Sequence, residues 1–144
     1  MTVLTGAVTV ESAPKYLYVD SSSLIRVAMG DHNAAALHRT IVAAGRSATL
    51  VSSRLLELEA RRTSVRLALD GVDASPIDAW VKETTLLPID DDVWRGAMRI
   101  RPHVKTLDSL HLATASLVPD CAMLTSDQNM KQVGRSLGIE VLDV

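Results

Sequence analysis

The 144-residue chain contains no phenylalanine and only two tryptophans and two tyrosines. Few side chains are therefore present on which nucleic-acid bases could stack, so recognition of any nucleic acid would have to use mainly shape and phosphate contacts. Its single cysteine, Cys121, excludes an internal disulfide and fits a reducing cytoplasm. No apolar run approaches the ~20 residues that a membrane span requires. Residues 1–15 also lack the basic start and the continuous apolar stretch of a signal peptide.

The chain also has no large excess of positive or negative charge, since its net charge is −2 and its isoelectric point is about 6.0. The basic footprint that is typical of DNA-binding domains is therefore missing. The positive charges nevertheless gather in two segments, which fit solvated helix faces or, as an alternative, a basic rim for phosphates. These residues are Arg54, Arg61, Arg62 and Arg66 in the first segment and Arg95, Arg99, Arg101, His103 and Lys105 in the second.

The hydrophobic content of 47% predicts a folded core, and the length fits one domain. Residues 1–14 show no clear period and are expected to form a loose leader, with the domain covering 15–144. Short apolar runs then alternate with helical patterns, which predicts right-handed crossovers around a mainly parallel sheet with helices on both faces. The expected strands are 16–19, 49–51, 86–89, 122–125 and 139–142, and the expected helices are 21–29, 33–44, 54–69, 76–84, 90–100, a helix from 106, and 128–137.

Four carboxylates lie at informative positions in this pattern. Asp20 directly follows one expected strand, and Asp127 follows another by two residues. Glu59 lies inside a helix, and Asp108 opens another helix. Acids just past the ends of parallel strands gather at the edge where open α/β sheets bind ligands. Crowded carboxylates repel one another unless a cation neutralises them, and oxygen ligands suit Mg²⁺ or Mn²⁺. The pattern favours a metal-dependent phosphodiesterase, although each acid taken alone could also be a helix cap or a first-turn residue.

Helix geometry separates Glu59 from its neighbour Glu57. At about 100° per residue, Glu59 falls inside the apolar arc of its helix, whereas Glu57 points outward and is expected to pair with Arg61. A carboxylate on a buried arc needs compensation, which makes Glu59 the candidate functional acid. Arg62 and Arg66 project within about 60° of Glu59. They could bind a substrate phosphate or balance Glu59 structurally.

His111 lies three residues after Asp108, on the same helix. We expect it to be a packed, hydrogen-bonded residue rather than a metal ligand. The remaining histidines, at 32, 38 and 103, show no ligand spacing with it, so the sequence predicts no zinc site.

Four segments of this chain resemble the motifs of PIN domains. Residues 18–25 (YVDSSSLI) resemble the opening motif, and residues 51–62 (VSSRLLELEARR) are similar to the second. Residues 106–115 (TLDSLHLATA) are a close match to the third and most specific motif. Residues 124–127 (LTSD) resemble the fourth but have Ser126 where an aromatic residue often stands. Size and motif style resemble the VapC ribonuclease toxins of type II toxin–antitoxin systems.

This resemblance implies a PIN-like three-layer α/β/α sandwich and a ribonuclease that uses Mg²⁺ or Mn²⁺. It implies Asp20, Glu59, Asp108 and Asp127 as the acidic catalytic cluster, with Asp20 and Asp108 as direct metal ligands. The implied partners are an RNA substrate, a VapB-like antitoxin and a second copy of the chain. Two other classes stay open: a receiver-like or phosphatase-like domain with a phospho-accepting aspartate, for which Lys131 would be the nearest lysine, and a protein-interaction module whose acids are only caps.

Overall fold

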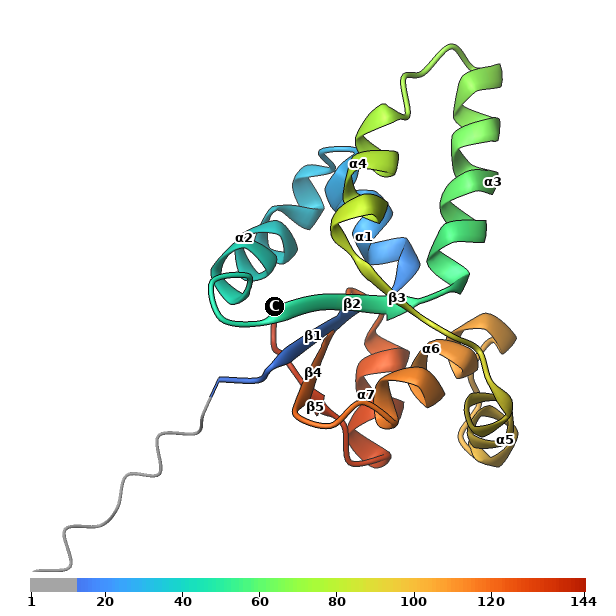
Figure 1. The fold of residues 1–144 in the computed structure, drawn as a ribbon. Coiled ribbons are helices and arrows are strands. Elements are labelled where there is room, and N and C mark those ends of the chain that lie inside the picture. The colour runs from blue at the N-terminus through green and yellow to red at the C-terminus, as the bar shows by residue number, and fades with distance from the viewer. Residues whose placement is uncertain (1–12) are drawn as a thin grey trace, which may run out of the picture.

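The computed structural model describes residues 13–144, and the expected leader at 1–14 therefore lies almost wholly outside the described residues. The centre of the domain is a five-stranded sheet in the order β3-β2-β1-β4-β5 (Figure 1). Every neighbouring pair of strands is parallel, so the sheet is wholly parallel where the sequence predicted a mainly parallel one. The strands are β1 Tyr16–Val19, β2 Thr49–Ser53, β3 Thr85–Leu87, β4 Cys121–Leu124 and β5 Glu140–Val141.

Helices cover both faces of this sheet, so the fold is the expected three-layer sandwich (Figure 1). Alternate residues of β1 point to opposite faces, as a period of two requires. Leu17 and Val19 join a core with α1 to α4, whereas Tyr18 joins a second core with α6 and α7. The helices are α1 Ser21–Ala28, α2 Ala35–Ala44 (preceded by a 3₁₀ turn, His32–Ala34), α3 Leu55–Leu69, α4 Ser75–Glu83, α5 Asp91–Arg99, α6 Thr106–Ser116 and α7 Gln128–Ser136.

Most element boundaries follow the sequence pattern to within one or two residues, and the differences have local causes. The first turn after Asp31 is a separate 3₁₀ helix, because the Asp31 side chain accepts from the Asn33 amide and caps that turn. Helix α6 begins at Thr106, as expected, and its N-cap residue, Lys105, makes no capping hydrogen bond with its side chain. Cys121 lies within β4 and is half-buried rather than fully in the core.

Two glycines set the position of α7. A Cβ at Gly134 would lie 2.7 Å from the methyl carbon of Met123 in β4, so this position lets the helix pack closely on the sheet. Gly138 has a φ of +80°, and the chain turns there into β5. The helix that begins after Asp127 is therefore held firmly beside β4.

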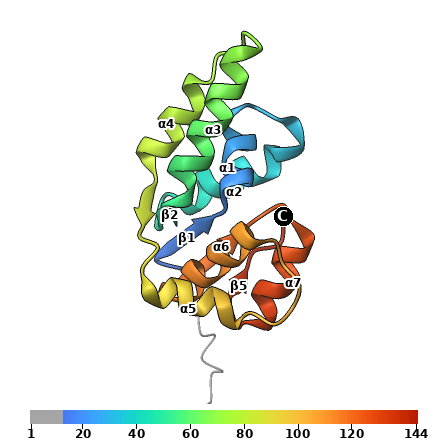
Figure 2. The ribbon, with the colours of Figure 1, turned by 90° about the vertical axis from the view of Figure 1, so that its right-hand side faces the viewer.

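Helices α3 and α4 form an arm that extends beyond the sheet (Figure 1). The lower half of α3 packs through Leu56 and Ala60 into the core, whereas Leu69 near its far end is 84% exposed. Strand β2 runs toward the right-hand side of Figure 1. Figure 2 turns this side toward the viewer and shows α3, α5 and α6 on it.

Candidate active site

The sheet brings Asp20 and Asp127 to the same edge. Val19 at the end of β1 pairs in register with Leu124 at the end of β4, and an acid follows each strand within three residues. Because the strands are parallel, their carboxyl ends meet at one side of the sheet. This is the arrangement that the sequence predicts for these two acids.

Asp20 is a buried carboxylate, with 2% of the residue exposed. It occupies the N-cap position of α1, but its side chain makes no capping hydrogen bond. The Ser22 hydroxyl donates to Oδ2 at 2.8 Å, whereas the buried Oδ1 has no hydrogen-bond partner among residues 13–144. An unsatisfied buried carboxylate oxygen is costly, so Asp20 is poorly explained as a cap and is suited to meet a cation.

Asp108 and Asp127 lie within electrostatic reach of Asp20. The pKa of Asp108 is raised first by burial and then by the negative charges of Asp127 and Asp20, with opposing effects from His111 and Lys105. One oxygen of Asp127 accepts a hydrogen bond of 2.9 Å from the Met130 amide and so caps α7. The three aspartates therefore form a cluster whose charges repel one another.

Glu59 joins this region through His111. Its Oε1 lies 3.2 Å from Nε2 of the imidazole, and the side chain is mostly buried. Burial alone would raise the Glu59 pKa, but hydrogen bonds from His111 and Ser21 and the attraction of His111 outweigh it, so the pKa is lowered. Glu57 is exposed, as its helical phase predicts, but its ion pair is with Arg54 at 3.9 Å and not with Arg61.

Arg62 and Arg66 are exposed on α3. Neither forms an ion pair with an acid within residues 13–144, and Glu59 pairs with His111 instead. These contacts therefore do not support the role in which Arg62 and Arg66 balance the charge of Glu59.

His111 is the packed, hydrogen-bonded residue that the sequence predicts, with 2% exposed. Its Nδ1 lies 2.6 Å from the Tyr18 hydroxyl, and its Nε2 lies 3.0 Å from the Ser21 hydroxyl. Sequence reasoning assigned Tyr18 only to a buried strand, since a tyrosine in an apolar run gives no signal of a distant histidine. Lys131 donates at 3.3 Å to the Val144 carbonyl, a contact that gives no support to the phospho-acceptor alternative.

A second network, missed by the sequence analysis, holds the loop before Asp127. The Ser126 amide donates to the Ser23 hydroxyl at 3.1 Å, and Arg26 donates to the Ser126 hydroxyl at 3.0 Å. Arg26 is itself held by Asp31 at 3.0 Å. The serine at the position where PIN motifs often have an aromatic residue thus ties the fourth motif to α1.

The donor set of the cluster fits Mg²⁺ or Mn²⁺, because it offers carboxylate oxygens and the free Oδ1 of Asp20. Among residues 13–144, no three His, Cys, Asp or Glu side chains converge into a ready cage for a metal. Mg²⁺ usually keeps several waters and is bound by only one or two carboxylates together with substrate phosphates, so a complete protein cage is not required.

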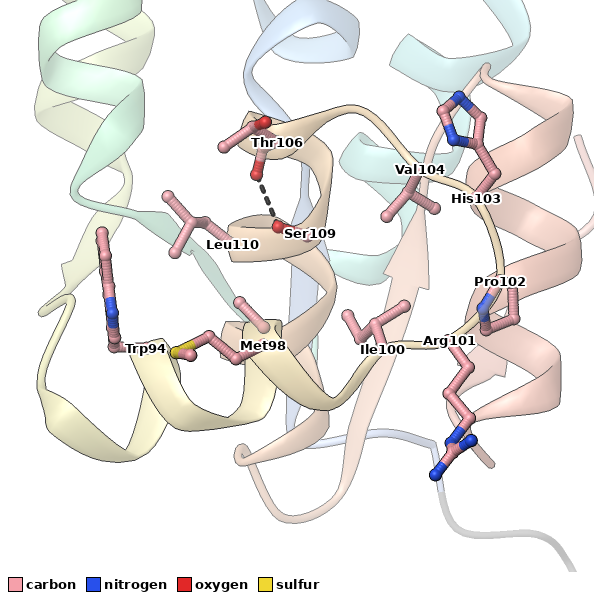
Figure 3. Close-up of a pocket in the computed structure, with 11 residues that line it drawn as sticks. Trp94, Met98, Ile100, Arg101, Pro102, His103, Val104, Thr106, Ser109 and Leu110 are labelled. Atoms are coloured by element: carbon pink, nitrogen blue, oxygen red, sulfur yellow. Dashed lines mark hydrogen bonds between the residues drawn. The ribbon is translucent and has the colours of Figure 1, made fainter.

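A groove of about 390 Å³ lies between α5, α6 and the connecting loop (Figure 3). Trp94 and Met98 lie side by side along its α5 wall, and Arg101 and His103 lie on the loop (Figure 3). In the described part of the chain, no helix is long and apolar enough to cross a membrane.

Comparison with known families finds a match to the PIN domain over residues 17–136. This match covers most of the chain and includes all four acids. A comparison with curated proteins finds no match.

Proposed function

Because this chain belongs to the PIN-domain family, whose members are generally metal-dependent nucleases, we propose that it is an endoribonuclease dependent on Mg²⁺ or Mn²⁺. The observation that carries this proposal is the buried, unpaired Oδ1 of Asp20 beside the charges of Asp108 and Asp127. An acid that serves as a helix cap has one side-chain oxygen bonded to a backbone amide, as Asp90 and Asp127 have. Asp20 has no such pairing.

In this proposal Asp20 and Asp108 hold the metal, and Glu59 and Asp127 belong to the same acidic cluster. When bound, the ion would lower the pKa of a water and stabilise negative charge on phosphate oxygens. Ser22 fixes one oxygen of Asp20, and the Met130 amide fixes one oxygen of Asp127. Arg62 and Arg66, exposed and without ion pairs to described acids, are suited to bind RNA phosphates.

Cleavage of RNA with and without metal tests this function. The purified chain should cut a mixture of structured RNAs with Mg²⁺ or Mn²⁺ and stop when EDTA is added. Mapping the new RNA ends would identify the substrate and the cut position. Cleavage that continues unchanged in EDTA, or that the Asp20→Asn variant retains in full, would contradict the proposal.

We further propose that the enzyme is the toxin of a VapBC-like module, as the motif style implies. A cognate antitoxin would lay an apolar segment on the helices and place a basic residue among the carboxylates. Such a charge-assisted contact with a buried acid such as Asp20 is stronger than a surface pair. Expression with and without the neighbouring reading frame should show growth arrest only without it. Changing the inserted arginine of the antitoxin to alanine should relieve inhibition even if the complex still forms.

The homodimer implied by the resemblance is best supported at α5. Trp94 and Met98 are 59% and 76% exposed, one helical turn apart. The exposed Asp91 precedes this pair by one turn, and the exposed Arg101 follows it. An antiparallel packing of two copies about a two-fold axis would bury the apolar pair and set Asp91 of one copy opposite Arg101 of the other.

A further inference from the structure

His111 occupies a junction between three elements of the fold. From α6, its ring contacts the Tyr18 hydroxyl of β1 at 2.6 Å through Nδ1 and the Glu59 carboxylate of α3 at 3.2 Å through Nε2. Tyr18 is 0% exposed and His111 is 2% exposed, so water does not compete for the contact between these two side chains. The two rings also meet edge to face, with centroids 5.8 Å apart. The junction therefore combines polar contacts with close ring packing.

The hydroxyl of Tyr18 is held in place from a second direction. The Ser53 amide of β2 donates to its oxygen at 3.1 Å. Burial, followed by the negative charge of Asp20, raises the pKa of Tyr18, so the hydroxyl keeps its proton. Having accepted from Ser53, this oxygen still has its proton to donate, and Nδ1 of His111 is the nearby acceptor.

In a neutral imidazole, these contacts select one tautomer. An ionised carboxylate can only accept, so the bond to Glu59 requires a proton on Nε2. In the neutral ring Nδ1 is then an acceptor, which is what the Tyr18 hydroxyl needs. The Ser21 hydroxyl, 3.0 Å from Nε2, can share the same proton. With the opposite tautomer, the ring would present a lone pair to Glu59, and the bond would be lost.

We propose that Tyr18 and His111 are positioning residues that fix the location of Glu59 in the active site by holding the imidazole in the Nε2–H tautomer. The role in cleavage rests on the proposed ribonuclease function, whereas the tautomer can be measured without any RNA. The hydrogen bonds run from the Ser53 amide to Tyr18, from Tyr18 to His111 and from His111 to Glu59. These bonds connect Glu59, the acid of the second motif, to α6, the helix that carries Asp108. Loss of either ring contact frees Glu59 without removing any carboxylate.

The chain offers matched variants for the test. Tyr18→Phe removes one hydroxyl, and Tyr16→Phe removes the other tyrosine hydroxyl of the same strand as a control. His111→Gln keeps an amide donor near the position of Nε2, facing Glu59. His111→Asn keeps a polar group only near the position of Nδ1, facing Tyr18. A purely structural role gives no reason for glutamine to rescue more than asparagine.

The first measurement is the ¹⁵N spectrum of the imidazole in metal-free protein. Wild type and Tyr16→Phe should show the Nε2–H tautomer for His111, whereas Tyr18→Phe should shift the Nδ1 resonance, because this nitrogen loses its hydrogen-bond donor. An Nδ1–H tautomer in wild type would overturn the proposal, whatever the result with RNA. An unchanged spectrum in Tyr18→Phe would overturn the part assigned to Tyr18.

The second measurement is the kinetics of RNA cleavage. Tyr18→Phe and His111→Asn should lower kcat by about 10- to 100-fold, a loss of the size that outer-shell partners of a metal site give, with little change in KM. His111→Gln should retain more activity than His111→Asn. Equal activity of Tyr18→Phe and Tyr16→Phe, or no rescue by glutamine, would overturn the positioning role. If wild type itself cuts no RNA, the proposed function fails and the catalytic part of this inference fails with it, while the spectra still decide the tautomer.

Discussion

The Ser22 hydroxyl donates to Oδ2 of Asp20 at 2.8 Å, and the buried Oδ1 of the same carboxylate has no hydrogen-bond partner among residues 13–144. One oxygen of this carboxylate is thus fixed by the protein, and the other is not. We therefore expect Asp20 to be sensitive to substitution.

We predict that Asp20→Asn lowers RNA cleavage by at least ~100-fold, because the amide keeps the shape but removes the charge that attracts a metal. Circular dichroism should show an unchanged fold, and the melting temperature should not fall, since a repulsive charge is removed. Asp91→Asn, at an exposed acid, is the control and should cleave normally. Cleavage by Asp20→Asn at the wild-type rate would exclude Asp20 from the site.

The two glutamates of α3 give a sharper contrast. Glu59→Gln should cost at least ~10-fold in kcat, because this side chain is half-buried and bonded to His111. Glu57→Gln should be nearly silent, since it loses only an exposed pair with Arg54 that contributes less than about 1 kcal/mol. Single-turnover cleavage by the two variants, measured side by side, decides between them. The reverse order would show that Glu57 is the second-motif acid.

The raised pKa of Asp108 predicts how stability depends on pH. Burial and the charges of Asp127 and Asp20 hold the folded-state pKa above its ordinary value of 3.8. The folded state therefore keeps this proton to higher pH than the unfolded state does, and stability is lost as pH rises through the folded pKa. Asp108→Asn removes that cost.

In EDTA near neutral pH, Asp108→Asn should melt about 1–3 °C above wild type. Below the ordinary aspartate pKa this difference should vanish, because the wild-type carboxyl is protonated in both states. Differential scanning calorimetry at the two pH values measures both differences. Added Mg²⁺ should raise the melting temperature of wild type and not that of the variant. A variant less stable than wild type at neutral pH would contradict the repulsion.

The exposed arginines of α3 are predicted to act on binding rather than on chemistry. Arg62→Gln and Arg66→Gln should raise the KM for RNA and leave kcat nearly unchanged. Each variant should also lower the magnitude of the slope of log affinity against log salt, by the amount that corresponds to about one phosphate contact. The control is Arg46→Gln, an exposed arginine between α2 and β2. Equal effects of all three changes would indicate only the loss of net charge.

Self-association through α5 is tested by Met98→Glu. We expect wild type to sediment as a dimer and Met98→Glu as a monomer, because a buried glutamate at the centre of the interface is costly. Leu69→Glu, at a more exposed apolar residue on the α3 arm, should leave the dimer intact. The reversal Asp91→Arg should weaken association, and the double variant Asp91→Arg/Arg101→Asp should restore it. A monomeric wild type would exclude this dimer. Dissociation by Leu69→Glu but not by Met98→Glu would place the interface elsewhere.

The sequence by itself determined the order of the elements and the acids that follow them. Short apolar runs at 16–19 and 122–125 predicted two of the strands, because an apolar run between polar or turn residues is a local property of the sequence. The helical phase of α3 separated the half-buried Glu59 from the exposed Glu57 for the same reason. The four PIN-like motifs identified the family, and the match over residues 17–136 confirms it.

Only the tertiary structure decided which distant side chains meet. Tyr18 and His111 are 93 residues apart, and Ser23 and Ser126 are 103 residues apart, so no local pattern could pair them. The partner of Glu57 was likewise settled by side-chain placement, as i+3 and i+4 neighbours are equally close on a helix. Periodicity specifies which face of an element is buried, but the parallel order of the strands decides what that face meets. For this reason the acids could be named from the sequence, whereas the hydrogen bonds that hold Glu59 could not.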